Sequence, residues 1–342
     1  MKIGILTHPQ HFNYGGILQC FALSTFLEQM GHEVVVINRR PNSCKVKEIC
    51  VSFLRRCHVL CYYNKNAVER GAKMRSFIEK KLVRTKEIKS NRAINSVCKN
   101  YGIQAVVVGS DQVWRADFAM RFGYNYFLDF VPHNVKKISY AASFGLSTWN
   151  YTQDQTEKIK ELLAGFRGVS VREKDAVTLC KEHLGLEVMQ MPDPTLLLSE
   201  SDYGKLASPR LVEDKYVFVY WLGEKSRIEA KIKEYESQQY KVVYVGLREQ
   251  RELPSIADWL SYIKYADVVL TDSFHGCVFS IMFKKRLQVF ANDSGGNGRV
   301  SSLFRIFGVE GYYFNPSECT QTSQVLITLR QEAKKFINNS LR

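Results

Sequence analysis

Short apolar segments rich in β-branched residues alternate with helical segments along the whole chain. Each apolar segment is bounded by polar or glycine-containing turns, as buried strands are, and the segments between them carry apolar residues at helical spacing. This alternation predicts an α/β protein with mainly parallel sheets covered on both faces, as in Rossmann-like folds. The expected strands are Lys2–Thr7, Glu33–Asn38, Ala105–Val108, Tyr126–Phe130, Lys137–Ala142, Gly168–Val171, Tyr216–Trp221, Lys241–Val245 and Ala266–Leu270. The expected helices include Ile17–Met30, Gln153–Leu163, Lys225–Tyr235, Ser255–Ile263 and Gly276–Phe283.

The length of 342 residues exceeds the usual size of one domain and favours two. We expect an N-terminal Rossmann-like domain over residues 1–165, with a basic helical insertion at about residues 39–92. A C-terminal Rossmann-like domain would cover residues 166–342, and its last helix could pack back on the first domain.

The composition is ordinary for an enzyme that works in water, with 45% hydrophobic and 24% charged residues. No apolar run approaches the roughly 18 to 20 residues that a membrane span requires. The first residues, Met1 to Thr7, read as a strand and not as a signal peptide, because the apolar run is short and polar residues follow it. We therefore expect a cytoplasmic protein.

The nine cysteines are an odd number without paired short spacings. This pattern favours reduced thiols over a disulfide framework. Four cysteines cluster, but their spacing matches no familiar zinc pattern, so no metal is expected. They are Cys44, Cys50, Cys57 and Cys61.

The net charge of +14 is concentrated in residues 39–92, which contain 16 Lys or Arg against 4 Glu and no Asp, so that 16 − 4 = +12. Within this region apolar residues from Ile49 to Cys61 recur at helical spacing, while Arg55 and Arg56 fall on the opposite face. Such a basic amphipathic helix could lie on an anionic membrane surface or meet phosphates. It could equally be a core-packed helix with a solvated basic face.

The segment Thr271-Asp272-Ser273-Phe274-His275-Gly276 joins an expected strand to an expected helix. In open α/β sheets, ligands bind at the carboxyl ends of strands, where helix N-termini offer free amide groups to anions. His275 is therefore expected to meet a negatively charged substrate. The Gly15-Gly16 pair that precedes another helix lacks the spacing of the dinucleotide fingerprint, so NAD binding is not expected.

Six segments, taken in order, resemble the polysaccharide pyruvyl transferase family over nearly the full length of the chain. They are Asn13-Tyr14-Gly15-Gly16 with Gln19, Gly109-Ser110-Asp111-Gln112-Val113-Trp114, Ser170-Val171-Arg172-Glu173, Asp193-Pro194, Thr271 to Gly276, and Asn297-Gly298-Arg299. The order of the six is specific, although each segment alone is weak. Better-described branches of the family carry Arg-Leu-His where this chain has Ser273-Phe274-His275, so one donor contact must come from elsewhere or the donor differs.

The resemblance implies a two-domain fold similar to that of GT-B glycosyltransferases, with the acceptor on the N-terminal side and the donor on the C-terminal side. It implies transfer of a pyruvyl group from phosphoenolpyruvate to a hexose of a bacterial capsule or exopolysaccharide precursor, as a cyclic ketal. Neither a cofactor nor a metal is expected. The acceptor would be a galactose-like sugar in a lipid-linked oligosaccharide, and the basic helix would hold the enzyme at the inner face of the membrane.

Phosphoenolpyruvate carries a carboxylate and a phosphate, and arginine recognises both groups bidentately. We therefore assign Arg172 and Arg299, with Ser273 and Gly276, to donor binding. His275 could donate a proton or stabilise the leaving phosphate, and Asp272 or Asp111 could activate the sugar hydroxyl or only cap a helix. The predicted catalytic residues are His275 and Asp272. The expected acceptor or cleft residues are Asn13, Tyr14, Gly15, Gly16, Gln19, Ser110, Asp111, Gln112 and Trp114.

Several alternatives stay open. Trp114, Tyr140 and Trp221 could stack on a sugar, but such aromatics are more often core residues. His8 and His11 could reach the cleft, or only belong to a polar loop. The same architecture could host a glycosyltransferase that uses a nucleotide sugar. A non-enzymatic protein that binds membranes or nucleic acid through its basic charge is a third reading, although we expect no nucleic-acid partner.

Overall fold

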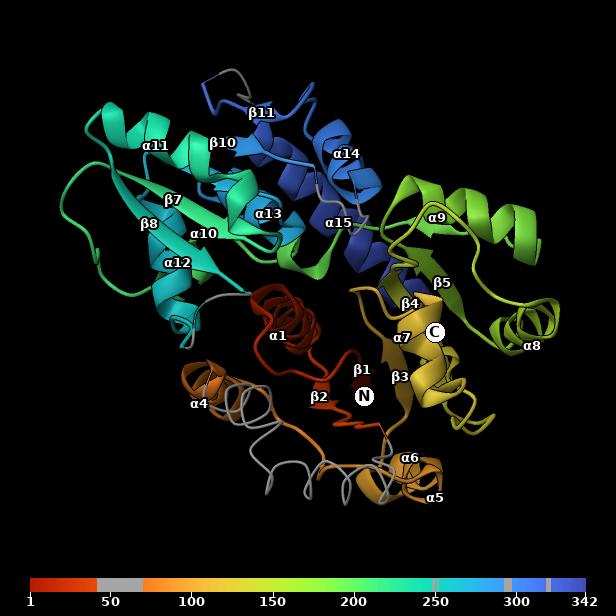
Figure 1. Ribbon diagram of the computed structural model, residues 1–342. Helices are drawn as coiled ribbons and strands as arrows, with labels where there is room; N and C mark the ends of the chain where they lie inside the picture. The colour runs from red at the N-terminus through yellow and green to blue at the C-terminus, as the bar shows by residue number, and fades with distance from the viewer. Residues whose placement is uncertain (42–69, 248–249, 251, 292–296, 318–320) are drawn as a thin grey trace, which may run out of the picture.

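The computed structural model describes residues 1–41, 70–247, 250, 252–291, 297–317 and 321–342. The expected basic amphipathic helix and the four clustered cysteines lie outside these residues. In the described part, strands and helices alternate and form two sheets with helices around them (Figure 1).

The first sheet has six strands in the order β2-β1-β3-β4-β5-β6, and every pairing in it is parallel. Its central strands are buried because β-branched residues fill them, as in β3 with the sequence Ala-Val-Val-Val. The strands are β1 (Lys2–Leu6), β2 (Glu33–Val36), β3 (Ala105–Val108), β4 (Lys136–Ala142), β5 (Gly168–Val171) and β6 (Met189–Gln190).

The second sheet has five strands in the order β11-β10-β9-β7-β8. All its pairings are parallel except that of the short edge strand β11. The strands are β7 (Tyr216–Trp221), β8 (Lys241–Gly246), β9 (Val268–Thr271), β10 (Arg286–Val289) and β11 (Tyr313–Phe314). The predicted α/β class with mainly parallel sheets is confirmed.

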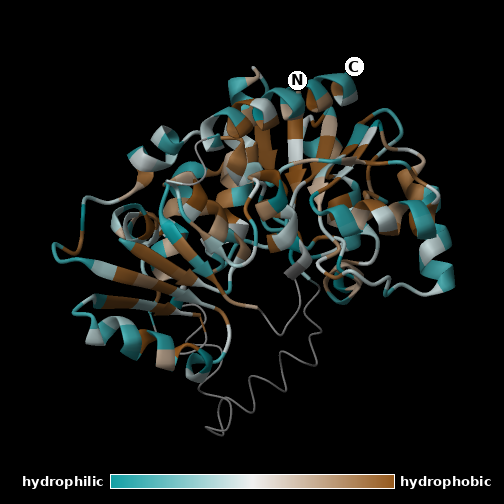
Figure 2. Ribbon diagram, turned by 90° about the horizontal axis from the view of Figure 1, so that it is seen from above, coloured by the Kyte–Doolittle hydropathy of each residue, from teal (hydrophilic) through white to brown (hydrophobic). Residues whose placement is uncertain are grey.

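Helices cover the faces of both sheets, and Figure 2 shows apolar strands inside polar outer helices. The α-helices are α1 (Tyr14–Gln29), α4 (Ala72–Lys81), α5 (Asn91–Asn95), α6 (Val97–Tyr101), α7 (Ala116–Ala119), α8 (Gln153–Leu163), α9 (Lys174–Leu179), α10 (Glu200–Leu206), α11 (Glu229–Ser237), α12 (Ile256–Tyr265), α13 (Phe274–Met282), α14 (Asn297–Ile306) and α15 (Thr322–Leu341). Short 3-10 turns include η2 (Asn125–Phe127) and η4 (Pro194–Leu196). Within the described residues, no helix has the length and apolarity to cross a membrane.

The strand expected at Tyr126–Phe130 is wrong. This segment forms η2 and a turn with Leu128 at a positive φ of 55°. Its aromatic side chains are buried, and the ring of Phe127 stacks on that of Trp114 with centroids 5.5 Å apart. Packing of the rings in the core therefore explains the apolar pattern without any sheet pairing.

The domain division expected near residue 165 is too early. Strands β5 and β6, which follow it, pair with β4 in the first sheet, so the chain changes sheet only after Gln190. The last helix, α15, packs against β5. A Cβ atom built at Gly168 would lie 2.1 Å from Ser340 Oγ, so this glycine permits the close approach.

The two sheets with their connecting helices are called here the first unit (β1–β6) and the second unit (β7–β11), and one cluster of buried apolar residues extends through both. Helix α1 lies between them (Figure 1). The Tyr14 ring in α1 stacks on Trp259 of α12, with centroids 4.9 Å apart and planes 13° from parallel. Its hydroxyl donates to the Pro254 carbonyl at 2.8 Å. Tyr14 thus joins the two units.

Candidate active site

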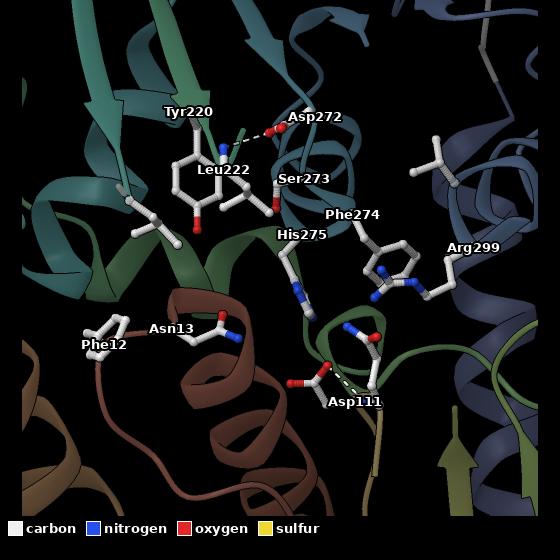
Figure 3. Close-up of a pocket in the computed structure, with 13 residues that line it drawn as sticks. Phe12, Asn13, Asp111, Tyr220, Leu222, Asp272, Ser273, Phe274, His275 and Arg299 are labelled. Atoms are coloured by element: carbon white, nitrogen blue, oxygen red, sulfur yellow. Dashed lines mark hydrogen bonds between the residues drawn. The ribbon is translucent and has the colours of Figure 1, made fainter. Parts of the chain in front are cut away.

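A cavity of about 220 Å³ lies between the two units, where loops that follow strands of both sheets meet. The first unit contributes the residues before α1 and the loop after β3. The second unit contributes the loops after β7, β8 and β9 and the start of α14 (Figure 3). The cavity is lined by Phe12, Asn13, Asp111, Gln112, Tyr220, Leu222, Leu247, Asp272, Ser273, Phe274, His275, Arg299 and Val300.

His275 is the second residue of α13 and points into this cavity (Figure 3). The residue is 7% exposed, and its Nε2 atom has no hydrogen-bond partner among the described residues. Gly15 of α1 packs against the other edge of the ring. A Cβ atom at Gly15 would lie 1.9 Å from His275 Nδ1, so only glycine leaves room for the imidazole.

The N-terminus of α13 also presents backbone donors. Ser273 is the N-cap, and its hydroxyl oxygen accepts from the Gly276 amide at 3.3 Å. The Ser273 amide donates to Thr271 Oγ1. The amides of Phe274 and His275 have no acceptor in the described part of the chain. Free amides and the helix dipole together favour an anion at this position.

Asp193 is a fully buried carboxylate behind His275, and it was not among the predicted site residues. Its Oδ2 atom accepts from Arg172 Nη1 at 2.7 Å and from Ser110 Oγ at 3.0 Å, and lies 3.6 Å from His275 Nε2. Burial by itself would raise the pKa of this carboxyl. His275, Arg172 and the amide of Thr195 outweigh burial and hold the pKa well below its ordinary value. Asp193 therefore stays ionised at neutral pH.

Arg172 belongs to this buried network and does not line the cavity. Its Nε atom lies 3.6 Å from Glu173 Oε2, and its guanidinium covers the Phe274 ring at 4.7 Å. Burial would lower its pKa, but Asp193 and Glu173 outweigh burial and raise it. In this structure Arg172 lies behind the cavity wall as the counter-ion of Asp193. Its direct binding of the pyruvyl donor stays a prediction.

Arg299, in the first turn of α14, does line the cavity. Its Nε atom is buried and has no hydrogen-bond partner among the described residues. Burial and the charge of Arg172 lower its pKa to about 10, so the guanidinium remains charged at neutral pH. The neighbouring Gly298 lets α14 approach α9, because a Cβ atom there would lie 2.5 Å from Asp175 Oδ2.

Asp111, after β3, faces His275 across the cavity (Figure 3). Its φ of 75° is unusual for a residue other than glycine, and such strain is frequent at functional sites. Burial would raise its pKa, but His8, Arg172 and two further basic side chains outweigh burial and lower it. Its Oδ1 atom accepts from the Gln112 amide at 2.9 Å.

Asp272, after β9, lines the cavity from the second unit. Its two oxygens accept from the amides of Leu222 and Gly223 at 2.8 and 2.9 Å. Burial nevertheless outweighs these bonds and raises its pKa. Each carboxylate oxygen has two lone pairs, so Asp272 can still accept from a ligand hydroxyl.

Several predicted site residues do not line the cavity but support it. Gln19 donates to Thr7 Oγ1 and to the Gly16 carbonyl, and Ser110 donates to Asp193. Gly276 is a packing residue, since a Cβ atom there would lie 2.5 Å from Thr271 Oγ1. Tyr14, Gly15 and Gly16 form the first turn of α1, where Asn13 is the N-cap and does line the cavity.

The aromatic residues considered for sugar stacking are core residues. Trp114, Tyr140 and Trp221 are each at most 1% exposed. The placement of Trp114 in the cleft is therefore wrong: its indole donates to the Tyr126 carbonyl inside the first unit. His8 and His11 also lie outside the cavity lining, and His11 contacts Arg40 instead.

The sequence-based prediction missed the apolar part of the lining. Apart from Phe274, which lies in the Thr271 to Gly276 segment, these residues belong to no recognised motif, and only the meeting of separate loops brings them together. They are Phe12, Tyr220, Leu222, Leu247, Phe274 and Val300. For Asp193 a signal existed, because Asp193-Pro194 was one of the six segments of the family resemblance. Within the described residues, no three His, Cys, Asp or Glu side chains gather as a metal site would require.

The two units and the cavity between them define a GT-B-like α/β protein. A UDP-GlcNAc 2-epimerase from Neisseria meningitidis bound to UDP-GlcNAc has a TM-score of 0.55 at 11% identity, covering 100% of both chains. A putative UDP-N-acetylglucosamine 2-epimerase from Listeria monocytogenes has a TM-score of 0.54 at 11% identity, covering 97% of this chain and 90% of that chain. At such low identity these similarities show the fold alone, and they confirm the predicted GT-B-like arrangement.

The sequence matches the polysaccharide pyruvyl transferase family over residues 13–294. The chain therefore belongs to this family, as the six segments predicted. It is a transferase, with a pyruvyl-transfer role in polysaccharide biosynthesis. None of the curated proteins resembles the sequence significantly.

Proposed function

We propose that this enzyme transfers the pyruvyl group of phosphoenolpyruvate to two hydroxyls of a hexose, as a cyclic ketal. The observation that carries the proposal is the cavity between the units. There, the imidazole of His275, the guanidinium of Arg299 and two amides of α13 that have no acceptor among the described residues surround one small space. Together they supply cationic and neutral donors for a phosphate and a carboxylate held close together.

The cavity volume also favours a small donor. Pockets for drug-sized ligands occupy roughly 300 to 1,000 Å³, and this cavity has about 220 Å³. A three-carbon phosphate suits this space better than a nucleotide sugar. Arg299 would replace the arginine that other branches carry two positions before the histidine.

The first of two steps needs two proton transfers, and the cavity has a group for each. One sugar oxygen bonds to C2 of the donor while C3 takes a proton and becomes a methyl group. The second sugar hydroxyl then displaces the phosphate from C2, and its proton leaves with the inorganic phosphate. His275 would deliver the proton to C3. Asp272 would accept the hydroxyl proton, because burial raises its pKa while that of Asp111 is lowered.

The acceptor in this proposal is a galactose-like hexose of an oligosaccharide linked to a polyprenyl lipid, made for a capsule or exopolysaccharide. Family membership supports a polysaccharide acceptor. The charge excess in residues 39–92 supports contact with the anionic inner face of a bacterial membrane. No cofactor takes part in the proposed reaction.

The direct test supplies purified enzyme with phosphoenolpyruvate and candidate lipid-linked sugars. The expected result is release of inorganic phosphate and a product heavier by about 70 daltons, the mass of pyruvic acid less water. His275→Ala should fold and lose about 10²- to 10⁴-fold in turnover, as expected on removal of a general acid. An active wild-type enzyme with an equally active His275→Ala variant would exclude the assigned acid.

Ligand-induced thermal stabilisation separates this proposal from the alternatives. A ligand that binds only the native state raises the unfolding midpoint. Stabilisation by phosphoenolpyruvate and not by nucleotide sugars is expected. The reverse result would favour a glycosyltransferase, and no stabilisation by either would favour the non-enzymatic reading.

A further inference from the structure

The side chain of Asp193 contacts residues of three separate elements near the cavity, besides capping the turn that follows it. It follows β6 and begins η4, and its carboxylate contacts Ser110 after β3, Arg172 after β5 and His275 of α13 in the second unit. We propose that Asp193 is a positioning residue, which orients the imidazole of His275 and keeps its Nε2 atom protonated. This role rests on the proposed function, in which His275 is the acid.

The two oxygens of Asp193 have separate partners. Oδ1 accepts from the amide and the hydroxyl of Thr195, at 3.0 and 2.7 Å, and so caps η4. A helix cap needs only one side-chain oxygen. Oδ2 is directed away from η4, towards Arg172, Ser110 and His275. Capping of η4 therefore uses only Oδ1, and Oδ2 is available for contacts at the interface between the units.

The His275 ring is held on two sides by residues of the first unit. Gly15 packs against Nδ1, and Asp193 faces Nε2, which has no hydrogen-bond partner among the described residues. The 3.6 Å separation from Asp193 is longer than a hydrogen bond. Such contacts are often long without substrate and shorten in the reactive complex. A carboxylate at this position favours the tautomer with the proton on Nε2, just as the aspartate of a catalytic triad fixes the proton on the opposite ring nitrogen, Nδ1.

Nuclear magnetic resonance of the ring nitrogens tests the proposal without any substrate. The chain has seven histidines, so ¹⁵N-histidine labelling yields few signals, and His275→Gln identifies those of His275. In the wild-type protein, neutral His275 is expected as the Nε2–H form. A wild-type signal from the Nδ1–H form, or from a mixture, would overturn the proposal without any substitution at Asp193.

A pair of variants isolates the carboxylate. Arg172→Met keeps Asp193 and should retain the Nε2–H signal. Arg172→Met combined with Asp193→Leu removes both charges, which avoids a lone buried cation, and leaves no acceptor at position 193. A mixed or Nδ1–H signal is expected there. An unchanged Nε2–H signal in the double variant would show that another group fixes the ring.

Thr195→Val is the matched control for the structural role, since it removes a hydroxyl bonded to Oδ1 and leaves Oδ2 unchanged. It should lower stability without altering the His275 signal. In the turnover assay, the double variant should have a kcat about 10- to 100-fold below that of Arg172→Met, with a similar KM for phosphoenolpyruvate. Equal kcat values would overturn the positioning role. Absence of wild-type turnover would instead refute the proposed reaction, while the resonance result would still decide the role of Asp193.

Discussion

Gly15 and His275 come from different units, and their contact sets the position of the proposed acid. Replacing Gly15 with alanine would place a methyl group about where the imidazole now lies. Because both residues are buried, the ring must move or the units must separate. We expect Gly15→Ala to destabilise the fold by about 1–3 kcal/mol, the usual cost of overpacking. Turnover should fall by about 100-fold through displacement of His275.

Gly16→Ala is the matched control for this prediction. The nearest atoms to a Cβ at Gly16 lie at 3.4 Å, and Gly16 is also in the first turn of α1. Alanine has the better helix propensity, so the change in unfolding free energy should be small or stabilising. Chemical denaturation and steady-state kinetics of the two variants check both statements. Equal losses at Gly15 and Gly16 would contradict the steric argument.

At the scale of the element, the N-terminus of α13 combines a side-chain cap with the anion site of the proposed function. Ser273→Asp keeps a good N-cap residue, which should offset part of the cost of burying a carboxylate beside Asp272, so the variant should fold with reduced stability. The new carboxylate would stand beside the phosphate or carboxylate of the donor and repel it. We expect the KM for phosphoenolpyruvate to rise about tenfold or more, which corresponds to roughly 1.4 kcal/mol.

Thr152→Asp introduces the same acidic cap at a helix remote from the cavity. Thr152 is the exposed N-cap of α8 and does not line the cavity. The Thr152→Asp variant should have the same KM for phosphoenolpyruvate as the wild-type enzyme. If the two variants raise the KM for phosphoenolpyruvate equally, the added charge acts through the long-range electrostatic potential of the protein. The N-terminus of α13 would then not be a specific anion site.

At the scale of the whole molecule, buried carboxylates make stability depend on pH. In the folded state the pKa values of Asp111 and Asp193 lie below that of an ordinary aspartate, about 3.9. Their ionised forms therefore stabilise the fold fully above about pH 4, and this contribution is lost as the pH falls further. Asp272, whose pKa is raised, acts in the opposite sense and offsets part of the effect.

Denaturant midpoints at about pH 7, 5 and 3 measure this dependence. The denaturant midpoint of the wild-type protein should change little between about pH 7 and about pH 5, and it should fall at about pH 3. In the Arg172→Met, Asp193→Leu double variant the fall should be smaller, because one depressed carboxyl is missing. An equal fall in both proteins would assign the acid sensitivity to other groups.

The order of strands and helices could be predicted because β-branched runs such as Ala105–Val108 need only local information. Assignment of strands to sheets could not, since nothing in Gly168–Val171 shows that it pairs with β4 and not with β7. The Tyr126–Phe130 segment shows the same limit: its aromatic pattern reports burial, and burial is possible in a turn as well as in a strand.

In the site, His275, Asp111, Asp272 and Arg299 could be located because polar residues after strands or before helices gather at one edge of a sheet. Whether a given arginine faces the cavity or a buried carboxylate depends on partners far away in the chain. Arg172 lies on Asp193, 21 positions later, and that pairing has no local signal. The same holds for Trp114, whose direction into the core is fixed by the segment around Phe127.

The stack of Tyr14 on Trp259 restricts how substrates can reach the reaction centre. A swing of the two units apart would bring these rings, and the neighbouring Tyr220 ring, into water. Such exposure would cost several kcal/mol at about 25 cal/mol per Å² of apolar surface. The donor should therefore enter and leave through rearrangement of side chains and loops at the rim, with the halves of the molecule keeping their mutual orientation throughout the catalytic cycle.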